Sequence, residues 1–112
     1  MAQSSETNEG LRYNSGKVRL DLLPPEWITA LGDVMTQGAE KYAERNWEAG
    51  MDWSHCYASA MRHLLKFWNG GDIDEESGLP HVTHAAWNCL ALLSYSLHKP
   101  EFDNRPGHAE ES

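Results

Sequence analysis

Apolar residues recur at every third or fourth position along three stretches of the chain, which is the spacing of amphipathic helices. The predicted helices span about residues 24–44, 52–68 and 80–97. The first begins at a pair of prolines, which are tolerated in the first helical turn, and the second ends at an asparagine followed by two glycines. No stretch of useful length alternates with period two, so strands are not expected. The pattern predicts an all-α fold, a compact helical bundle.

The third predicted helix is apolar almost all round, and such a helix is normally buried on most of its sides. His81, His84 and Asn88 lie on it at positions i, i+3 and i+7, so they share one face. Because burying bare polar groups is costly, this polar stripe has to be hydrogen-bonded or bound to a metal. Taken singly, His81 would be an exposed first-turn residue and His84 a satisfied core histidine. Together with Asn88 they favour a functional site.

A short acidic loop precedes this stripe and carries Asp72, Asp74, Glu75 and Glu76. Carboxylates crowded this closely repel one another unless a cation lies among them or water solvates them. Carboxylate oxygens beside imidazoles suit Mg²⁺ or Mn²⁺ and, with more histidines, Zn²⁺. Asp74 and Glu75, nearest the histidines, are the better ligand candidates, whereas Asp72 and Glu76 fit a solvated turn equally well. His63, on the flank of the second helix, could face the same pocket or lie on the surface.

Residues 12–19 concentrate three cations and a glycine before the first helix. A glycine turn followed by Lys17 and Arg19 suits phosphate recognition, although the segment is not a Walker A loop. Between the first two helices, Trp47 could stack on a base while Asn46 hydrogen-bonds it. Alternatively, Trp47 packs across the end of the first helix.

The chain has 112 residues, which is room for one domain. Polar residues 1–9 and 101–112 are expected to be flexible tails around a helical domain at 10–100. A domain of this size has a marginal core, so a homo-oligomer, a dimer or a tetramer, is the expected remedy.

The net charge of -8 argues against direct DNA binding, which depends on basic surface. Cys56 and Cys89 lie in apolar helices and are expected to be buried free thiols in a reducing cytosol. There is no signal peptide and no run long enough to span a membrane. A soluble, cytoplasmic protein is therefore expected.

Four ordered blocks between about residues 10 and 98 resemble the phage dATP/dGTP diphosphohydrolases, a family that is related to the MazG-like all-α nucleoside triphosphate pyrophosphohydrolases and includes the MazZ-type enzymes. The blocks are Arg12-Tyr13-Asn14-x-Gly16-Lys17-x-Arg19-Leu20-Asp21-Leu22-Leu23-Pro24-Pro25, Gly38-Ala39-x-Lys41-Tyr42-x-x-x-Asn46-Trp47-x-x-Gly50, Arg62-His63-Leu64, and Asp74-x-Glu76-x-Gly78-Leu79-Pro80-His81-x-x-His84-Ala85-Ala86-Trp87-Asn88.

This resemblance implies hydrolysis of dGTP or dATP to the monophosphate and pyrophosphate with Mg²⁺ or Mn²⁺, in the host cytoplasm if the protein is phage-encoded. In phages with a MazZ-type enzyme, the resulting dGMP feeds synthesis of diaminopurine nucleotides. One departure is clear. The Glu-x-x-Glu and Glu-x-x-Asp metal motifs of MazG-like enzymes are not intact here, since Gln37 stands three residues before Glu40 and His81-x-x-His84 replaces the second motif.

Residue roles follow from the resemblance taken together with the chemistry of the side chains. Glu75 or His84 would accept a proton from the attacking water. The expected metal ligands are Asp74, Glu75, Glu76, His63, His81 and His84. The expected substrate contacts are Lys17, Arg19 and Lys41 to phosphate, Asn46 and Trp47 to the purine, and Asn88.

Two other interpretations stay open. An HD-type phosphohydrolase could be built from His63, the acidic loop and His84, although the chain lacks a contiguous His-Asp pair. It would release triphosphate or inorganic phosphate. A non-enzymatic helical interaction module would use the polar stripe for packing and would show neither turnover nor a metal-dependent thermal shift.

Overall fold

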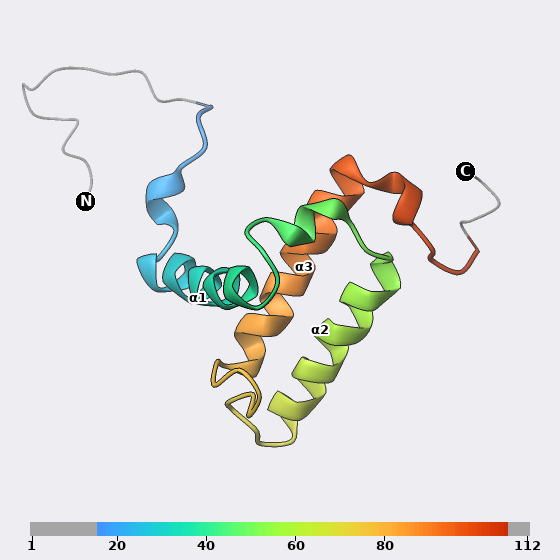
Figure 1. The fold of residues 1–112 in the computed structure, drawn as a ribbon. Coiled ribbons are helices and arrows are strands. Elements are labelled where there is room, and N and C mark those ends of the chain that lie inside the picture. Colours follow the sequence, from blue (N-terminus) through green and yellow to red (C-terminus); the bar gives the residue numbers. More distant parts are fainter. Residues whose placement is uncertain (1–15, 108–112) are drawn as a thin grey trace, which may run out of the picture.

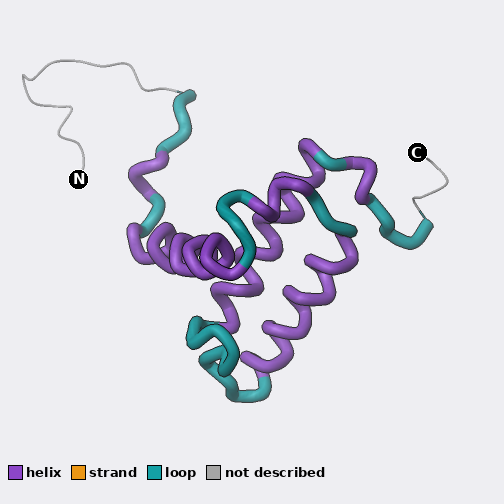
Figure 2. Tube along the Cα trace, in the orientation of Figure 1, coloured by secondary structure: helices purple, strands orange, loops and turns teal. Residues whose placement is uncertain are grey.

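The fold is all-helical, as the computed structural model shows for residues 16–107 (Figures 1 and 2). Within this range no strand forms, and Ile73 and Pro80 make one isolated antiparallel bridge. The all-α prediction is confirmed. The α-helices are α1 (Pro25–Lys41), α2 (Trp53–Trp68) and α3 (His81–His98), and the short 3₁₀ turns are η2 (Leu20–Leu22), η3 (Asn46–Ala49) and η4 (Pro100–Phe102).

Helices α2 and α3 lie side by side and antiparallel, joined by the acidic loop, while α1 contacts α3 and is seen almost along its own axis (Figure 1). Helix α1 ends at Lys41, three residues earlier than predicted. Arg45, which follows, has a left-handed backbone conformation with a φ of 60°. This bend brings η3 over the hairpin. None of the helices within residues 16–107 combines the length and apolarity of a membrane-spanning segment.

The core lies at the end of the hairpin where α2 begins and α3 ends, and it is small. Its centre is Tyr95, whose hydroxyl donates to the backbone carbonyl of Trp47 in η3. This bond and the ring contact between the two residues hold η3 against the hairpin. Of the residues that the structure describes, six apolar ones are buried, and three of these are alanines, which let α2 and α3 approach closely. The six are Trp53, Cys56, Ala60, Ala85, Ala91 and Tyr95.

Residues 100–107 fold back onto the start of α2, so the expected flexible tail does not begin at 101. Asn104 accepts a hydrogen bond from the Ser54 N–H at 3.0 Å, which satisfies one of the free amides of the first turn of α2. The ring of Phe102 covers Gly50, where an added Cβ would meet it at 2.5 Å. Glycine is required there because its φ is also 102°. Residues 1–15 and 108–112 lie outside the described range.

Helix α3 is not buried on most sides, contrary to the prediction from its apolar character. Leu93 and Leu97 are 56% and 67% exposed, because α1 and α2 cover only part of the helix surface. Cys89 lies on the uncovered part and is exposed, so the expectation of a buried thiol is wrong at this position. Cys56 is buried, as expected, and both thiols are free.

Candidate active site

A cavity of about 1390 Å³ lies between the second half of α1, η3 and one side of the α2–α3 hairpin. This volume exceeds the roughly 300–1,000 Å³ of ordinary small-molecule sites, so a nucleotide would fit. The cavity brings together eight of the residues that the sequence suggested. They are Lys41, Asn46, Trp47, His63, Asp74, Glu76, His84 and Asn88.

The acidic loop is a closed turn that holds Asp74 against the hairpin. The N–H of Asp74 donates to the carbonyl of Leu79 at 2.8 Å, and its carbonyl accepts from Gly78 at 2.7 Å. Its side-chain Oδ2 accepts from the N–H of Ser77 at 2.9 Å. Burial alone would raise the pKa of Asp74. The hydrogen bonds from Ser77 and the nearby His84 lower this pKa by a larger amount, so the net shift is downward. Asp74 is therefore an ionised carboxylate near neutral pH.

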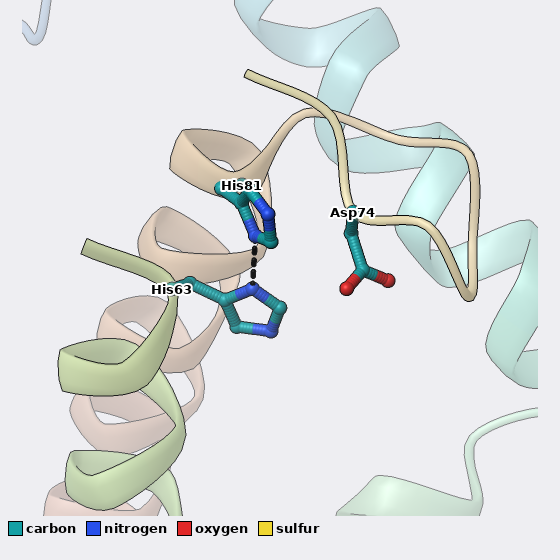
Figure 3. A group of neighbouring side chains, drawn as sticks. All are labelled: His63, Asp74 and His81. Atoms are coloured by element: carbon teal, nitrogen blue, oxygen red, sulfur yellow. Dashed lines mark hydrogen bonds between the residues drawn. The ribbon is translucent and has the colours of Figure 1, made fainter. Parts of the chain in front are cut away.

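Three imidazoles gather beside this carboxylate. The Nδ1 atoms of His63 and His81 are 2.9 Å apart (Figure 3). The ring of His63 also stacks on that of His84, with centroids 4.6 Å apart. Figure 3 also shows Asp74 extending from the loop toward His63 and His81. One ligand atom from each of His63, Asp74 and His81 lies within 4.8 Å of the others. These three residues, from α2, the loop and the start of α3, form the histidine–aspartate cluster.

The histidine–aspartate cluster fits a divalent ion by its donor chemistry. Two nitrogens that each lie about 2.1 Å from one ion, at right angles, would be about 3.0 Å apart, close to the observed separation. Burial, then repulsion by neighbouring imidazoles, lowers the pKa of His63, and Asp74 offsets this only in part. A neutral imidazole is the form that binds a metal. His81, 4% exposed, has its Nδ1 directed at His63 and so supplies the second nitrogen.

His84 lies next to this cluster and has a different partner. Ser77 Oγ is 2.7 Å from His84 Nε2, and it also accepts a hydrogen bond from the Leu79 N–H. The serine hydroxyl hydrogen is therefore free to donate to Nε2, which places the ring proton of neutral His84 on Nδ1. Burial lowers the pKa of His84, with Asp74 acting in the opposite direction. His84 is accordingly a neutral base whose Nε2 lone pair is held by Ser77.

These residues do not form the triad of serine hydrolases. Asp74 Oδ2 is 3.9 Å from His84 Nε2, the same nitrogen that contacts Ser77. In a Ser-His-Asp triad the acid contacts the opposite ring nitrogen. Ser77 could not be found from the helical pattern, because it lies in the loop before α3 begins. Gln37 of α1 was also missed as a contact, although it donates to the Ser77 carbonyl at 2.8 Å and ties α1 to the loop.

Asn88 presents a hydrogen-bond acceptor in the cavity. Its Nδ2 donates to the carbonyl of His84 at 2.9 Å and to Ser59 Oγ at 3.1 Å. A carbonyl can only accept, so the amide nitrogen must face His84 and the orientation of the amide is fixed. Both amide hydrogens are then used, and within residues 16–107 no side chain or backbone group donates to Oδ1.

Several predicted site residues lie elsewhere. Lys17 and Arg19 are exposed in the segment before α1 and do not line the cavity, and Arg19 forms a bidentate ion pair with Asp21. Glu75 is exposed on the loop and does not line the cavity either. Glu76 does line it, but its side chain is 84% exposed and its partner, at 3.7 Å, is Lys41. Arg12 to Ser15 of the N-terminal block lie outside the described residues.

Trp47 packs against α3 and also lines the cavity. Its ring contacts Tyr95 and Trp87, with centroids 6.1 Å and 6.2 Å apart, so it packs beyond the end of α1. It also lines the cavity, as does Trp87. Two cations whose roles the sequence did not assign, Arg62 and Lys66 of α2, line the cavity as well.

Comparisons with known proteins found similar sequences. A family model described as "dATP/dGTP diphosphohydrolase, N-terminal" matches residues 7–105. Over 96 residues the chain is 29% identical to a protein of Salmonella phage PMBT28 called dATP/dGTP diphosphohydrolase, and the match covers 86% of this chain. It covers 33% of that protein, so the chain spans about a third of the length of this curated relative. No solved structure matches the chain.

Proposed function

The chain belongs to the dATP/dGTP diphosphohydrolase N-terminal family, and from this premise we propose that it hydrolyses purine deoxynucleoside triphosphates to monophosphate and pyrophosphate with a divalent ion. The observation that carries the proposal is the histidine–aspartate cluster, of which His63 and Asp74 line a nucleotide-sized cavity while His81 is buried behind them; basic side chains line the same cavity. Neutral imidazoles and an ionised carboxylate bind a metal, and the cations suit a triphosphate.

His63, Asp74 and His81 are the proposed ligands. Because two of the three donors are imidazole nitrogens, the set favours Mn²⁺ or another transition ion over Mg²⁺, which prefers oxygen. When bound, such an ion supplies positive charge that offsets the phosphate charge and makes water more acidic. Glu75 and Glu76, exposed on the loop, are not needed for this set.

Lys41, Arg62 and Lys66 are the proposed phosphate contacts, because they line the cavity from two different helices. The Lys41–Glu76 ion pair is solvent-exposed and therefore weak, so a phosphate group can replace the carboxylate as its partner. These three residues take the role that the sequence assigned in part to Lys17 and Arg19.

His84 is the proposed proton acceptor. A water oxygen attacks the α-phosphorus, the bond from this phosphorus to the α–β bridging oxygen breaks, and pyrophosphate leaves. The water takes the place of the Ser77 hydroxyl as the donor to His84 Nε2 and passes its proton to this nitrogen, which is unprotonated because burial lowers the pKa of His84. Ser77 is a positioning residue that fixes the direction of the ring through its 2.7 Å contact with Nε2.

The purine is proposed to lie toward Trp47, Trp87 and Asn88. The two indoles offer aromatic surface at the cavity wall. The Oδ1 of Asn88 can accept from the exocyclic amino group of adenine or guanine, and both of its amide hydrogens are already used. An acceptor at this position suits either purine, in keeping with the two substrates in the family description.

The test is product analysis by ion exchange after incubation of the chain with each dNTP and Mn²⁺ or Mg²⁺, with and without EDTA. The expected result is purine dNMP and pyrophosphate, abolished by EDTA and by His63→Ala. A matched control is His98→Ala, since His98 is an exposed histidine that does not line the cavity. This variant should retain wild-type turnover.

Other products would identify the alternatives. Release of triphosphate or inorganic phosphate would replace the proposal with an HD-type phosphohydrolase. Absence of turnover with every nucleotide and both ions, together with an unchanged melting temperature on adding metal, would favour the interaction module.

A further inference from the structure

The α2–α3 hairpin has a second side that faces away from the cavity. Successive residues of a helix are about 100° apart around its axis, so residues two positions apart lie on nearly opposite sides. Arg62 and Lys66 line the cavity, and Leu64 between them therefore faces away from it. Likewise Val82 lies two positions before His84 of the cavity wall. Leu90 lies two positions after Asn88 of the cavity wall, and Leu93 and Leu97 follow Leu90 at three and seven positions, so they lie on the same side as Leu90.

This second side is apolar and uncovered within residues 16–107. Its exposed fractions run from 39% for Met61 to 84% for Trp68. No charged residue falls among the positions on this side of either helix, although the whole chain has a net charge of -8. We call it the back face, and its large apolar members are Tyr57, Met61, Leu64, Leu65 and Trp68 of α2 and Val82, Leu90, Leu93 and Leu97 of α3.

The size and charge of the back face indicate what covers it. Nine large apolar side chains at these exposures present an area on the order of the ~800 Å² per partner that a stable protein–protein interface buries. A two-fold contact between identical chains needs a surface complementary to itself, and an uncharged face meets this need because no like charges oppose each other. A partner that binds through charged side chains would have no opposite charge to pair with on this face.

We propose that the back face is where a second copy of this chain docks, so that two α2–α3 hairpins pack into one four-helix bundle. Within residues 16–107 of one chain six apolar residues are buried, three of them alanines, and the eighteen large side chains of two back faces would add a shared core to them. The two cavities lie on the outer sides of this dimer and stay open to ligand. This inference does not rest on the proposed enzymatic function.

The first test is the mass of the full chain in solution by sedimentation equilibrium. Wild type should have twice the mass of one chain, and Leu93→Glu should have the mass of a single chain, because a charge in the shared core has no partner. Ile28→Glu is the matched control, since Ile28 is 58% exposed on α1, outside the back face. It should remain a dimer. A wild-type monomer, or a dimer unaffected by Leu93→Glu, would overturn the proposal.

The two cysteines keep the test decisive if Leu93→Glu unfolds. Cys89 is exposed on the back-face side of α3, and Cys56 is fully buried in the core. In wild-type protein, alkylation followed by mass spectrometry should modify Cys89 about as slowly as Cys56. Dilution below the dimer dissociation constant should speed up Cys89 at least about tenfold and leave Cys56 protected, which shows that the fold persists. Rapid alkylation of Cys89 at every concentration would refute the dimer.

Discussion

The cavity side and the back face of the α2–α3 hairpin belong to the same two helices but differ in how their side chains are satisfied. On the cavity side, His63, His81 and Asn88 find hydrogen-bond partners within the chain, so their positions are fixed before any ligand arrives. On the back face, Leu93 and Trp68 contact little, and their exposed fractions are 56% and 84%. The cavity side fits the proposed binding of a metal ion and a nucleotide, and the back face fits the proposed docking of a second chain.

This difference shows that an apolar helix can serve two environments at once. Residues of α3 that face α2 and the cavity are polar, small or aromatic, such as Asn88, Ala91 and Tyr95, whereas the large residues on the other side are aliphatic. Along the sequence the residues of the two sides alternate, and only their positions around the helix axis distinguish them. Substitutions on each side should therefore have different effects, kinetic on the cavity side and thermodynamic on the back face.

The largest expected effect is on the cavity side. His84→Gln should lower turnover by about 10²–10⁴-fold, because it removes the proposed proton acceptor while retaining a side chain of similar size. The melting temperature should change little. Steady-state kinetics with dGTP and dATP checks the loss, and Ser77→Ala should cause a smaller loss, since the base is only less well oriented. Equal losses in both variants would mean that His84 acts only through Ser77.

The back face should respond in stability. Leu93→Ala is expected to cost about 2 kcal/mol in free energy of unfolding, because the second copy buries this side chain. A leucine that faces solvent would cost less than about 0.5 kcal/mol. Urea denaturation at two protein concentrations measures the difference, with Ile28→Ala as the control that should cost little. A cost below 0.5 kcal/mol for Leu93→Ala would remove the distinction between the back face and ordinary surface.

Tyr95 belongs to the core between the two sides and should show a pH effect. Burial raises the pKa of Tyr95 from 10.0 to about 12, so the folded chain holds this proton more tightly than the unfolded chain does. Its contribution is present below pH 10 and is lost as the pH rises from 10 to about 12. Tyr95→Phe should cost about 1 kcal/mol at pH 7, since the bond to Trp47 is lost.

Thermal unfolding followed at pH 8 to 12 checks this prediction. Wild type and Tyr95→Phe should converge in stability above pH 10, because deprotonation destabilises only the wild type. Parallel curves over the whole range would show that this hydroxyl does not contribute as described.

The smallest expected effect is at Lys17. In a single chain it lies outside the cavity, so Lys17→Ala should change kcat/KM less than about twofold, whereas Lys66→Ala should lower it about tenfold or more. Comparison of kcat/KM for the two variants is sufficient. A large loss for Lys17→Ala would mean that the segment before α1 reaches a cavity after all, which would put a second set of phosphate contacts beside the first.

The sequence predicted the helices well because their apolar period is regular and their ends carry Pro, Asn and Gly signals. It also brought His63, Asp74 and His84 into one hypothesis, since helical spacing and the adjacent loop place them close together. It could not decide whether Asp74 or Glu75 is the metal ligand. Neighbouring loop residues point in different directions, and only the hydrogen bonds of Asp74 to Ser77 and Leu79 select the one that faces the hairpin.

Other features depend on contacts between segments that are far apart in the sequence. Such contacts leave no periodic pattern from which they could be predicted. The docking of residues 100–107 on α2 rests on Asn104 and Ser54, fifty positions apart. The hydrogen bond from Gln37 to Ser77 spans forty positions. Polar composition at the C-terminal end suggested a tail, although these polar groups find partners on α2.

The most direct test of the account is Mn²⁺ binding measured by the loss of the free-ion electron paramagnetic resonance signal, without nucleotide. Asp74→Asn and Glu75→Gln change neighbouring carboxylates in the same way, but only Asp74 belongs to the histidine–aspartate cluster. Wild type and Glu75→Gln should bind the ion alike, and Asp74→Asn should bind it at least about tenfold more weakly. Equal binding by the two variants, or no binding by wild type, would contradict the account.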